Sequence, residues 1–462
     1  MFEIKYPKFT NSPYKHFKLV TPFRVSLMAI ALSACLSMPQ EKSSVPPTDT
    51  SSGTAAPISL PPQSSSPLVQ ALFEAPTVAR SFSAAIAAKA QVRIVTTEKS
   101  SKVDLSGSTG LTGENNHSTK GAAAATVKAY KLLYDNGQTD RSILLSELAA
   151  QSALRDAEII LDETLQEVVE AYGTRSAAKE TVKIIDYYLG LYNAREDLVK
   201  SAVQAGVLSN SDYLELRSLK NETLSERAQS QLGIERSESF LKNTLGVRYK
   251  AALSELNKIH GALKPPEFSV EASPQKKLID LRMAQLGTEI EIQEARNSVT
   301  AQWQTSVTSP QTRGADTTVF AGITIGLPLK DGGEAAARIE ALSEELTVTE
   351  QDLEILNQNT VLAKQSWNNF LDFHKVQKQL LLERKSISEE RISELELLLK
   401  AGRSDISELA KEILAGAQTE IALIQLKSEY LSQSLTAAAV TGQTCKLFTL
   451  CAQISSGLPE IS

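Results

Sequence analysis

The chain has 462 residues, of which 5% are aromatic, and its formal net charge is -6 at neutral pH. So few aromatic side chains argue against one large globular core, and 22 glycines and 17 prolines between long charged, Ala- and Leu-rich stretches indicate long helices. The acidic balance argues against nucleic acid as a partner, because proteins that bind nucleic acid present basic surfaces.

The amino terminus predicts an exported lipoprotein. A basic stretch that ends at Arg24 precedes an apolar run over residues 25–34, which is too short to span a bilayer as a helix but suits an export signal. The run closes with Leu32-Ser33-Ala34-Cys35, which resembles a bacterial lipobox. We therefore expect residues 1–34 to be a signal peptide and Cys35 to carry the lipid; the alternative is that Cys35 only ends an ordinary signal. By resemblance to other lipoproteins, Leu36 favours forwarding to the outer membrane.

After the cysteine the chain changes character twice before the first strand. Residues 35–67 are rich in Pro, Ser and Thr and have little to bury, so they predict a flexible tether between the lipid and the body. An Ala-rich helix is then expected over about residues 68–96.

Four stretches have the two-residue period of strands with one apolar and one polar face. We predict a hairpin of strands at about 102–112 and 122–134, and a second hairpin at about 298–308 and 317–329. Each stretch has about the 9 to 11 residues that a tilted outer-membrane strand needs. The alternation is clear in the first strand, where Val103, Leu105, Thr109 and Leu111 alternate with Lys102, Asp104, Ser106 and Ser108.

The residues after each hairpin predict long helices in an internal repeat. Residues 138–205 and 334–401 contain no Pro and carry aliphatic residues at coiled-coil-like spacing, and each would be ~100 Å long at ~1.5 Å per residue. Returning helices are expected over 211–297, with a break at 264–274, and over 404–439. The turn residues before and after the first long helix recur before and after the second, the same number of residues apart. This divides the chain into repeats at 68–297 and 298–442 and a tail at 443–462.

The tail contains Cys445 and Cys451. On one helix their Cα atoms would lie ~9 Å apart, too far for a disulfide, whereas in a loop they could be bridged in an oxidising compartment. Both outcomes stay open. No spacing of Cys and His predicts a metal or another cofactor, and His117, His260 and His374 have the scatter of ordinary surface residues. No catalytic motif appears, so no enzyme is expected.

The strands and helices together predict a shared channel. Four strands cannot close a barrel, and an open sheet edge in lipid leaves unpaired backbone groups, so copies of the chain must combine. After the signal there is no apolar stretch of about 18 residues that would form a membrane helix instead. Helices of this length that leave a membrane sheet would project from it as a bundle or tube.

This order of elements resembles the TolC family of outer-membrane efflux proteins. Two stretches match most closely: Gly322-Ile323-Thr324-Ile325-Gly326-Leu327-Pro328-Leu329-Lys330-Asp331-Gly332-Gly333 and Ala401-Gly402-Arg403-Ser404-Asp405-Ile406-Ser407-Glu408-Leu409. The resemblance implies a mainly α-helical protein with a membrane β-barrel: a homotrimer in which twelve strands form one barrel, continued by a helical periplasmic tunnel. It also implies a periplasmic adaptor and an inner-membrane pump, of the resistance-nodulation-division or ABC type, as partners.

The same resemblance nominates residues at the two hairpin tips. Docking on the adaptor maps to Gly206, Val207, Leu208, Ser209 and Asp212 in the first tip and to Gly402, Arg403, Ser404 and Ile406 in the second. The alternative is that these residues only build turns. The acidic rings that constrict the family's tunnel map to Glu408 and Lys411, and a cation at Lys411 is expected to pair with Glu408 three residues earlier.

Two other classes of protein fit parts of the pattern. A periplasmic adaptor lipoprotein would also carry a lipid and a helical hairpin, but it should have one hairpin flanked by small soluble β-domains. A long coiled-coil structural protein of the envelope would have the helices but not the amphipathic strands. The repeat and the four strands favour the channel, whose cargo the sequence does not specify.

Overall fold

The computed structural model describes residues 66–112, 120–296, 298–310, 316–327 and 331–458, which all belong to one unit of the chain, Leu60–Ser462. The predicted signal peptide, Cys35 and the tether up to residue 65 lie outside the described residues. So do the loop residues 113–119 and 311–315 and the last part of the strand predicted at 317–329.

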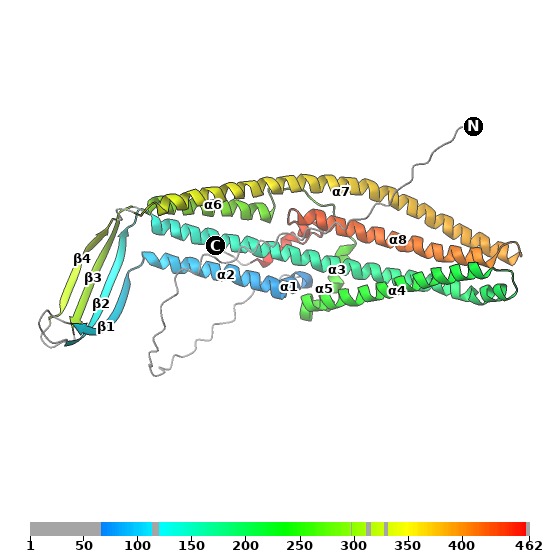
Figure 1. The fold of residues 1–462 in the computed structure, drawn as a ribbon, viewed down its shortest axis with the longest axis horizontal. Coiled ribbons are helices and arrows are strands. Elements are labelled where there is room, and N and C mark those ends of the chain that lie inside the picture. The colour runs from blue at the N-terminus through cyan, green and yellow to red at the C-terminus, as the bar shows by residue number, and fades with distance from the viewer. Residues whose placement is uncertain (1–65, 113–119, 297, 311–315, 328–330, 459–462) are drawn as a thin grey trace, which may run out of the picture. The chain divides into compact units, whose positions relative to one another are not determined.

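Four strands form one antiparallel sheet in the order β1-β2-β3-β4 (Figure 1). They are β1 (Lys102–Thr112), β2 (Lys120–Tyr134), β3 (Thr300–Pro310) and β4 (Thr318–Gly326). The two hairpins, one from each half of the chain, join through β2 and β3, where the hydroxyl groups of Thr126 and Thr308 lie 3.0 Å apart. The order leaves β1 and β4 at the two edges of the sheet.

Each hairpin leads into a very long helix. α3 (Gln138–Gln204) and α7 (Glu334–Lys400) each contain 67 residues and are ~100 Å long. Both start with the same cap, in which one aspartate accepts hydrogen bonds from two backbone N–H groups of the first turn. Asp135 accepts from the N–H groups of Gly137 and Thr139, and Asp331 accepts from the N–H groups of Gly333 and Ala335.

A left-handed residue pair precedes each long helix. The second half has two glycines here, Gly332 (φ 70°) and Gly333 (φ 89°), whereas the first half has Asn136 (φ 54°) and Gly137 (φ 76°). Asparagine tolerates the left-handed region better than most residues. The same turn therefore forms in both halves although the first contains a single glycine.

The returning helices differ in length. α8 (Ile406–Ala439) is continuous, but the first repeat returns as α4 (Asn210–Leu245), α5 (Tyr249–His260) and α6 (Pro274–Ala295). The expectation of one helix from residue 211 to the Pro265-Pro266 break was wrong, because Gly246 has a φ of 51° and starts a turn of 3-10 helix that separates α4 from α5.

The ends of the described chain form short helices. The predicted Ala-rich helix is two helices, α1 (Pro67–Glu74) and α2 (Pro76–Thr96), because Pro76 begins a new helix at its first position. The tail contains α9 (Thr444–Leu447) and α10 (Cys451–Gly457). Residues of α1 and of the tail are buried together with α3, α4, α5 and α8 in one hydrophobic core.

The long helices pack side by side (Figure 1). α3 contacts α2, α4, α6 and α8, while α7 contacts α6 and α8. A second hydrophobic core lies near the turns that join α3 to α4 and α7 to α8 and includes Leu216, Leu409, Ala410 and Ile413. In both repeats, therefore, a hairpin of two strands is followed by a long helix, a turn and a returning helical segment.

Candidate functional site

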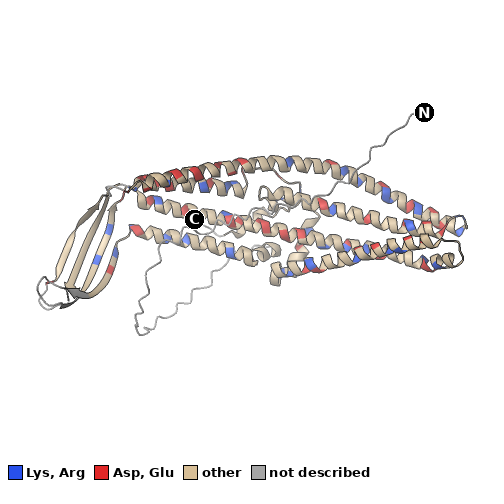
Figure 2. Cartoon of the chain, in the orientation of Figure 1, with Lys and Arg blue, Asp and Glu red and all other residues tan. Residues whose placement is uncertain are grey.

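One face of the sheet is apolar across all four strands. Side chains on this face come from cross-strand partners, so the register defines its members. The members with larger apolar side chains are Val103, Leu105, Val127, Trp303, Val307, Val319, Ile323 and Ile325, and each is at least partly exposed. Figure 2 shows that the sheet carries few charged residues, whereas the helices carry many. Such a face suits contact with hydrocarbon.

The opposite face of the same sheet is polar. In β3 it presents Gln302, Gln304, Ser306 and Thr308, and their cross-strand partners in β2 include Lys128 and Tyr130. The Lys128 ammonium group lies 5.2 Å from the centre of the Tyr130 ring. A sheet with one apolar and one polar face has the pattern of a barrel wall between lipid and water.

The two hairpin tips have the same backbone structure. Gly206 (φ 71°) and Gly402 (φ 69°) each follow a long helix in the left-handed conformation. The N–H of each glycine bonds the carbonyl three residues before it, and the N–H of the next residue bonds the carbonyl five residues before it, in both tips. This is a Schellman motif, whose left-handed position strongly favours glycine.

The nominated tip residues divide into exposed and buried ones. Val207 is 72% exposed, and the glycines, Ser209 and Arg403 are exposed as well. Leu208 (3% exposed) and Ile406 (5%) instead lie in the hydrophobic core of the tips. Ser209 caps α4 through a hydrogen bond from the Asp212 N–H, and Ser404 is partly exposed. Leu208 and Ile406 therefore pack inside the tips and are not on their surface.

Lys411 does not pair with Glu408, contrary to the expectation from sequence. Its ammonium group lies 2.7 Å from Glu215 and 3.9 Å from Asp212, both on α4. The hydrogen bond from Lys411 to Glu215 raises the pKa of the lysine, and the Asp212 charge acts in the same direction. Glu408 is exposed and lies near Ser404 in its own hairpin. The Lys411 contacts thus link the two helical hairpins at their tips. The spacing of residues along one helix does not reveal a partner on another helix.

Cys445 and Cys451 form a disulfide with a Cα–Cα distance of 5.0 Å. Of the two outcomes that the sequence left open, this is the bridged one, and it is possible because a loop separates α9 from α10. Asp162 of α3, 9% exposed, accepts hydrogen bonds from the N–H groups of Thr444 and Cys445. Burial raises the pKa of Asp162, although these hydrogen bonds oppose the shift.

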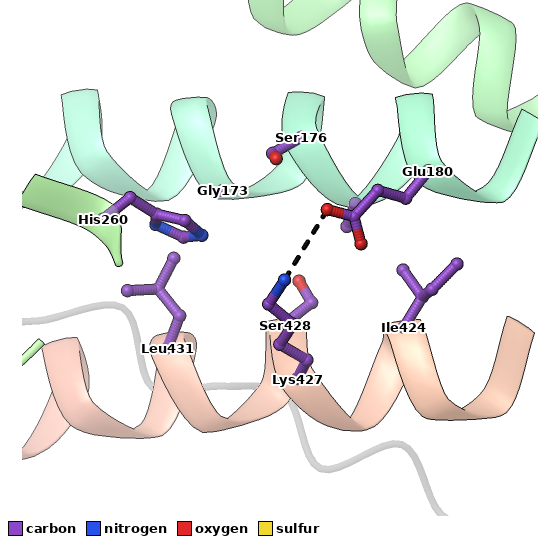
Figure 3. A pocket seen from close by; sticks show the side chains of 9 residues that line it. Gly173, Ser176, Glu180, His260, Ile424, Lys427, Ser428 and Leu431 are labelled. Carbon is purple, nitrogen blue, oxygen red and sulfur yellow. Dashed lines mark ion pairs between the residues drawn. The ribbon is translucent and has the colours of Figure 1, made fainter. Parts of the chain in front are cut away.

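His260 is partly buried and is not the surface residue that the sequence predicted. It lies at the end of α5, beside a small cavity between α3 and α8 (Figure 3). Its ring packs edge-on against the Tyr172 ring, with the ring centres 5.3 Å apart. The cavity wall also contains Glu180 and Lys427, whose charged groups are 3.6 Å apart. Burial lowers the pKa of His260, and the Lys427 charge lowers it further while Glu180 opposes both.

No described helix is both long enough and apolar enough to cross a membrane. Within the same residues, no group of three or more Cys, His, Asp or Glu side chains is placed to hold a metal ion.

The fold is similar to several solved structures. No protein-family model matches the chain, and no curated protein sequence matches it. The outer-membrane channel OprN is 17% identical, with a TM-score of 0.66 over 81% of this chain and 89% of its own. The CmeC outer membrane channel of Campylobacter jejuni is 12% identical, with a TM-score of 0.66 over 84% and 89%. The outer membrane protein VceC of Vibrio cholerae is 11% identical, with a TM-score of 0.67 over 81% and 95%.

Proposed function

We propose that this chain, which has the fold of the outer-membrane channels OprN and CmeC, is the exit duct of a tripartite efflux or secretion system. It would conduct cargo passively from a periplasmic adaptor and an inner-membrane pump to the exterior and would not act as an enzyme. The observation that carries the proposal is the continuous apolar face of a four-stranded sheet whose hairpins continue into two helical hairpins with matching tips. The resemblance to the TolC family is confirmed at the level of fold.

A trimer follows from the edges of the sheet. Among the described residues, β1 and β4 each present an edge with unpaired backbone groups, which in lipid would cost several kcal/mol per group. Three copies of a four-stranded sheet would pair β1 of one copy with β4 of the next and close a twelve-stranded barrel. Closure removes all edges, so the functional form is a homotrimer.

An unpartnered apolar seam on α7 supports the same assembly. Val348, Ile355, Leu362 and Val376 repeat at multiples of seven residues, and each side chain is more than half exposed. Phe373, Leu380 and Ile387 form the companion row, again with half or more of their surface exposed. A heptad pattern of this kind is buried in coiled coils, so a helix of a neighbouring copy would cover it.

The alternative classes fit less well. An adaptor lipoprotein would have one helical hairpin and soluble β-domains, but the described residues contain two hairpins and one sheet with an apolar exposed face. A structural coiled coil would not need that sheet. We place the protein in the outer membrane, with Cys35 as a lipid anchor; Cys35→Ser should abolish labelling by a fatty-acid probe, and persistent labelling would remove the anchor.

The test of the function is complementation in the native host. A strain that lacks this chain should accumulate one or more of a panel of dyes and toxic metal ions, and the wild-type gene should restore their extrusion. Gly402→Val, which strains a left-handed turn by about 1 to 3 kcal/mol, should keep the trimer but lose adaptor cross-linking and extrusion. Gly190→Val is the matched control, because Gly190 lies within α3 and a Cβ atom added there meets no atom of another part of the structure within 4 Å.

The outcomes separate the function from the docking site. If the deletion strain extrudes every compound at the wild-type rate, the efflux function is wrong. If Gly402→Val restores extrusion and cross-links normally, the tips are only turns, and the adaptor docks elsewhere on the helices.

A further inference from the structure

One cation interrupts the apolar face of the sheet. Lys131 of β2 is exposed and is the one charged side chain on that face among the described strand residues. Its cross-strand partner in β3 is Trp303, which in turn pairs with Ile323 of β4. Lys131 forms no ion pair with the described residues, so its exposed ammonium group is available to a partner outside this part of the chain.

A bulge places a second aromatic residue on the same face. The register of β2 against β3 shifts between Leu132 and Tyr134, so that Tyr134 lies opposite Ala301 and shares its face with Trp303. Trp303 is 41% exposed and Tyr134 is 53% exposed. Without the shift, Tyr134 would point to the polar face. Lys131 therefore shares its face with two exposed rings, Trp303 across the strand pair and Tyr134 further along β2, that each have an apolar body and a polar tip.

The level of Lys131 along the strand fits the edge of a membrane. Beyond it, β2 continues to Lys120, and the intervening ~37 Å of strand at ~3.4 Å per residue covers ~28 Å of height at a tilt of ~40°. The apolar band of outer-membrane barrels is ~25 Å tall. The row that contains Lys131 and Trp303 also lies close to Tyr134 and Ala301, at the end of the sheet from which the chain continues into the long helices. A membrane boundary at this row would therefore leave enough of the strand beyond it to span the whole apolar band.

An unpaired ammonium group is costly in hydrocarbon but is stabilised by phosphate at the membrane surface. Tryptophan and tyrosine gather at the same level, where their polar tips meet water and head groups. We propose that Lys131, Trp303 and Tyr134 form a head-group site for a phospholipid of the periplasmic leaflet. The Lys131 ammonium group binds the phosphate oxygens, and the two rings lie beside the glycerol region. This inference rests on the proposed function, because it requires the sheet to lie in a bilayer.

A second lysine in the same strand provides a matched control. Lys128 is three residues away but lies on the polar face, opposite Asp104 and close to the Tyr130 ring. Lys128→Leu removes the same charge from the same strand and the same hairpin. It should leave phospholipid binding unchanged, because this side chain faces away from the lipid.

The first experiment measures binding of phosphatidylglycerol to the delipidated full-length protein in detergent by native mass spectrometry. Loss of one basic contact at a membrane surface weakens binding about fivefold, so Lys131→Leu should bind the lipid about fivefold more weakly than the wild type. Lys128→Leu should match the wild type. Equal binding by all three proteins, or equal loss in both variants, overturns the site.

The second experiment measures the depth of Trp303 in bilayers. The chain contains two tryptophans, so Trp367→Phe leaves Trp303 as the single reporter. Lipids brominated near the glycerol end of the acyl chain should quench its fluorescence more strongly than lipids brominated near the methyl end. Stronger quenching from the methyl end would place the row in the hydrocarbon and overturn the head-group site while leaving the barrel intact. Quenching by aqueous iodide alone, with none by either lipid, would show that the sheet is not in the membrane and that the proposed function itself fails.

Discussion

The disulfide between Cys445 and Cys451 should hold the end of the chain in the core that surrounds α1. Between the cysteines, Leu447, Phe448 and Leu450 are each at most 2% exposed. The same loop contacts the connector between α5 and α6, because the Leu447 carbonyl accepts the Lys264 N–H at 3.0 Å and Lys446 pairs with Glu267 at 2.8 Å. The perturbation is the double variant Cys445→Ser, Cys451→Ser, which keeps the size of both side chains but opens the loop.

The size of the effect follows from the length of the closed loop. In the chain-entropy account, a bridge around about seven residues stabilises the closed form by about 2 kcal/mol. Local opening of the tail should therefore become about 30-fold more frequent in the double variant. Hydrogen exchange reports this at the N–H groups of Leu450 and Ile454, which bond the carbonyls of Cys445 and Leu450. Amides in the middle of α7 should exchange as in the wild type.

A reductant supplies the internal control for this prediction. It should raise exchange at the Leu450 and Ile454 amides in the wild type towards the level of the double variant, and it should leave the double variant itself unchanged. Exchange of the double variant at the wild-type rate in the tail, or an equal effect of the reductant on both proteins, would show that the disulfide does not hold the tail in place.

Three further predictions concern charge. Burial and Lys427 lower the pKa of His260, so the unfolded chain binds the proton more readily than the folded one, and stability should fall as the pH decreases below about 6.5. The free energy of unfolding of His260→Gln, measured in urea, should therefore depend less on acid pH than that of the wild type. An identical pH profile for both proteins would contradict this. Val307→Lys, near the middle of the apolar face, should destabilise the sheet in a bilayer by about 2 to 4 kcal/mol, whereas Ser306→Lys on the polar face should have little effect. Equal losses of folding free energy for both variants, measured in a folding titration, would show that neither face meets lipid. Lys411→Glu places three carboxylates together where a cation joined two hairpins, so it should loosen the tips and raise single-channel conductance in planar bilayers. Lys400→Glu, the same charge change at an exposed position before the turn, is the control. Equal conductance in both variants would show that the Lys411 ion pairs do not hold the tips together.

Elements with a strong period could be predicted from the sequence. Alternation placed the first strand at 102–112, where β1 lies, and the absence of breakers predicted the two long helices to within a residue at each end. The tip glycines were recognisable because a helix that stops without proline needs a left-handed residue to turn the chain. These features depend on neighbours within one or two turns, which the sequence displays directly.

Features that depend on distant partners could not be predicted. Lys411 has Glu408 within reach along its own helix, but its partner is Glu215 on another helix. His260 has no local feature that reveals a cavity between α3 and α8. Gly246 has a positive φ, whereas Gly173 and Gly190 continue their helix, and composition alone does not distinguish the three. The side-by-side placement of Lys131 and Trp303, and of Tyr134 on the same face, likewise depends on the register of β2 against β3 and on the bulge before Tyr134.

The central claim is that one chain contributes a third of a membrane barrel, and its most direct test is the mass of the full-length protein in mild detergent. Native mass spectrometry, or sedimentation with the detergent contribution matched, should give three copies of the 50.1 kDa chain, less any cleaved signal, at all concentrations above the detection limit. The reason is that the outer edges of β1 and β4 pair with no other strand of the described residues. A stable, folded monomer would contradict the barrel and with it the exit duct.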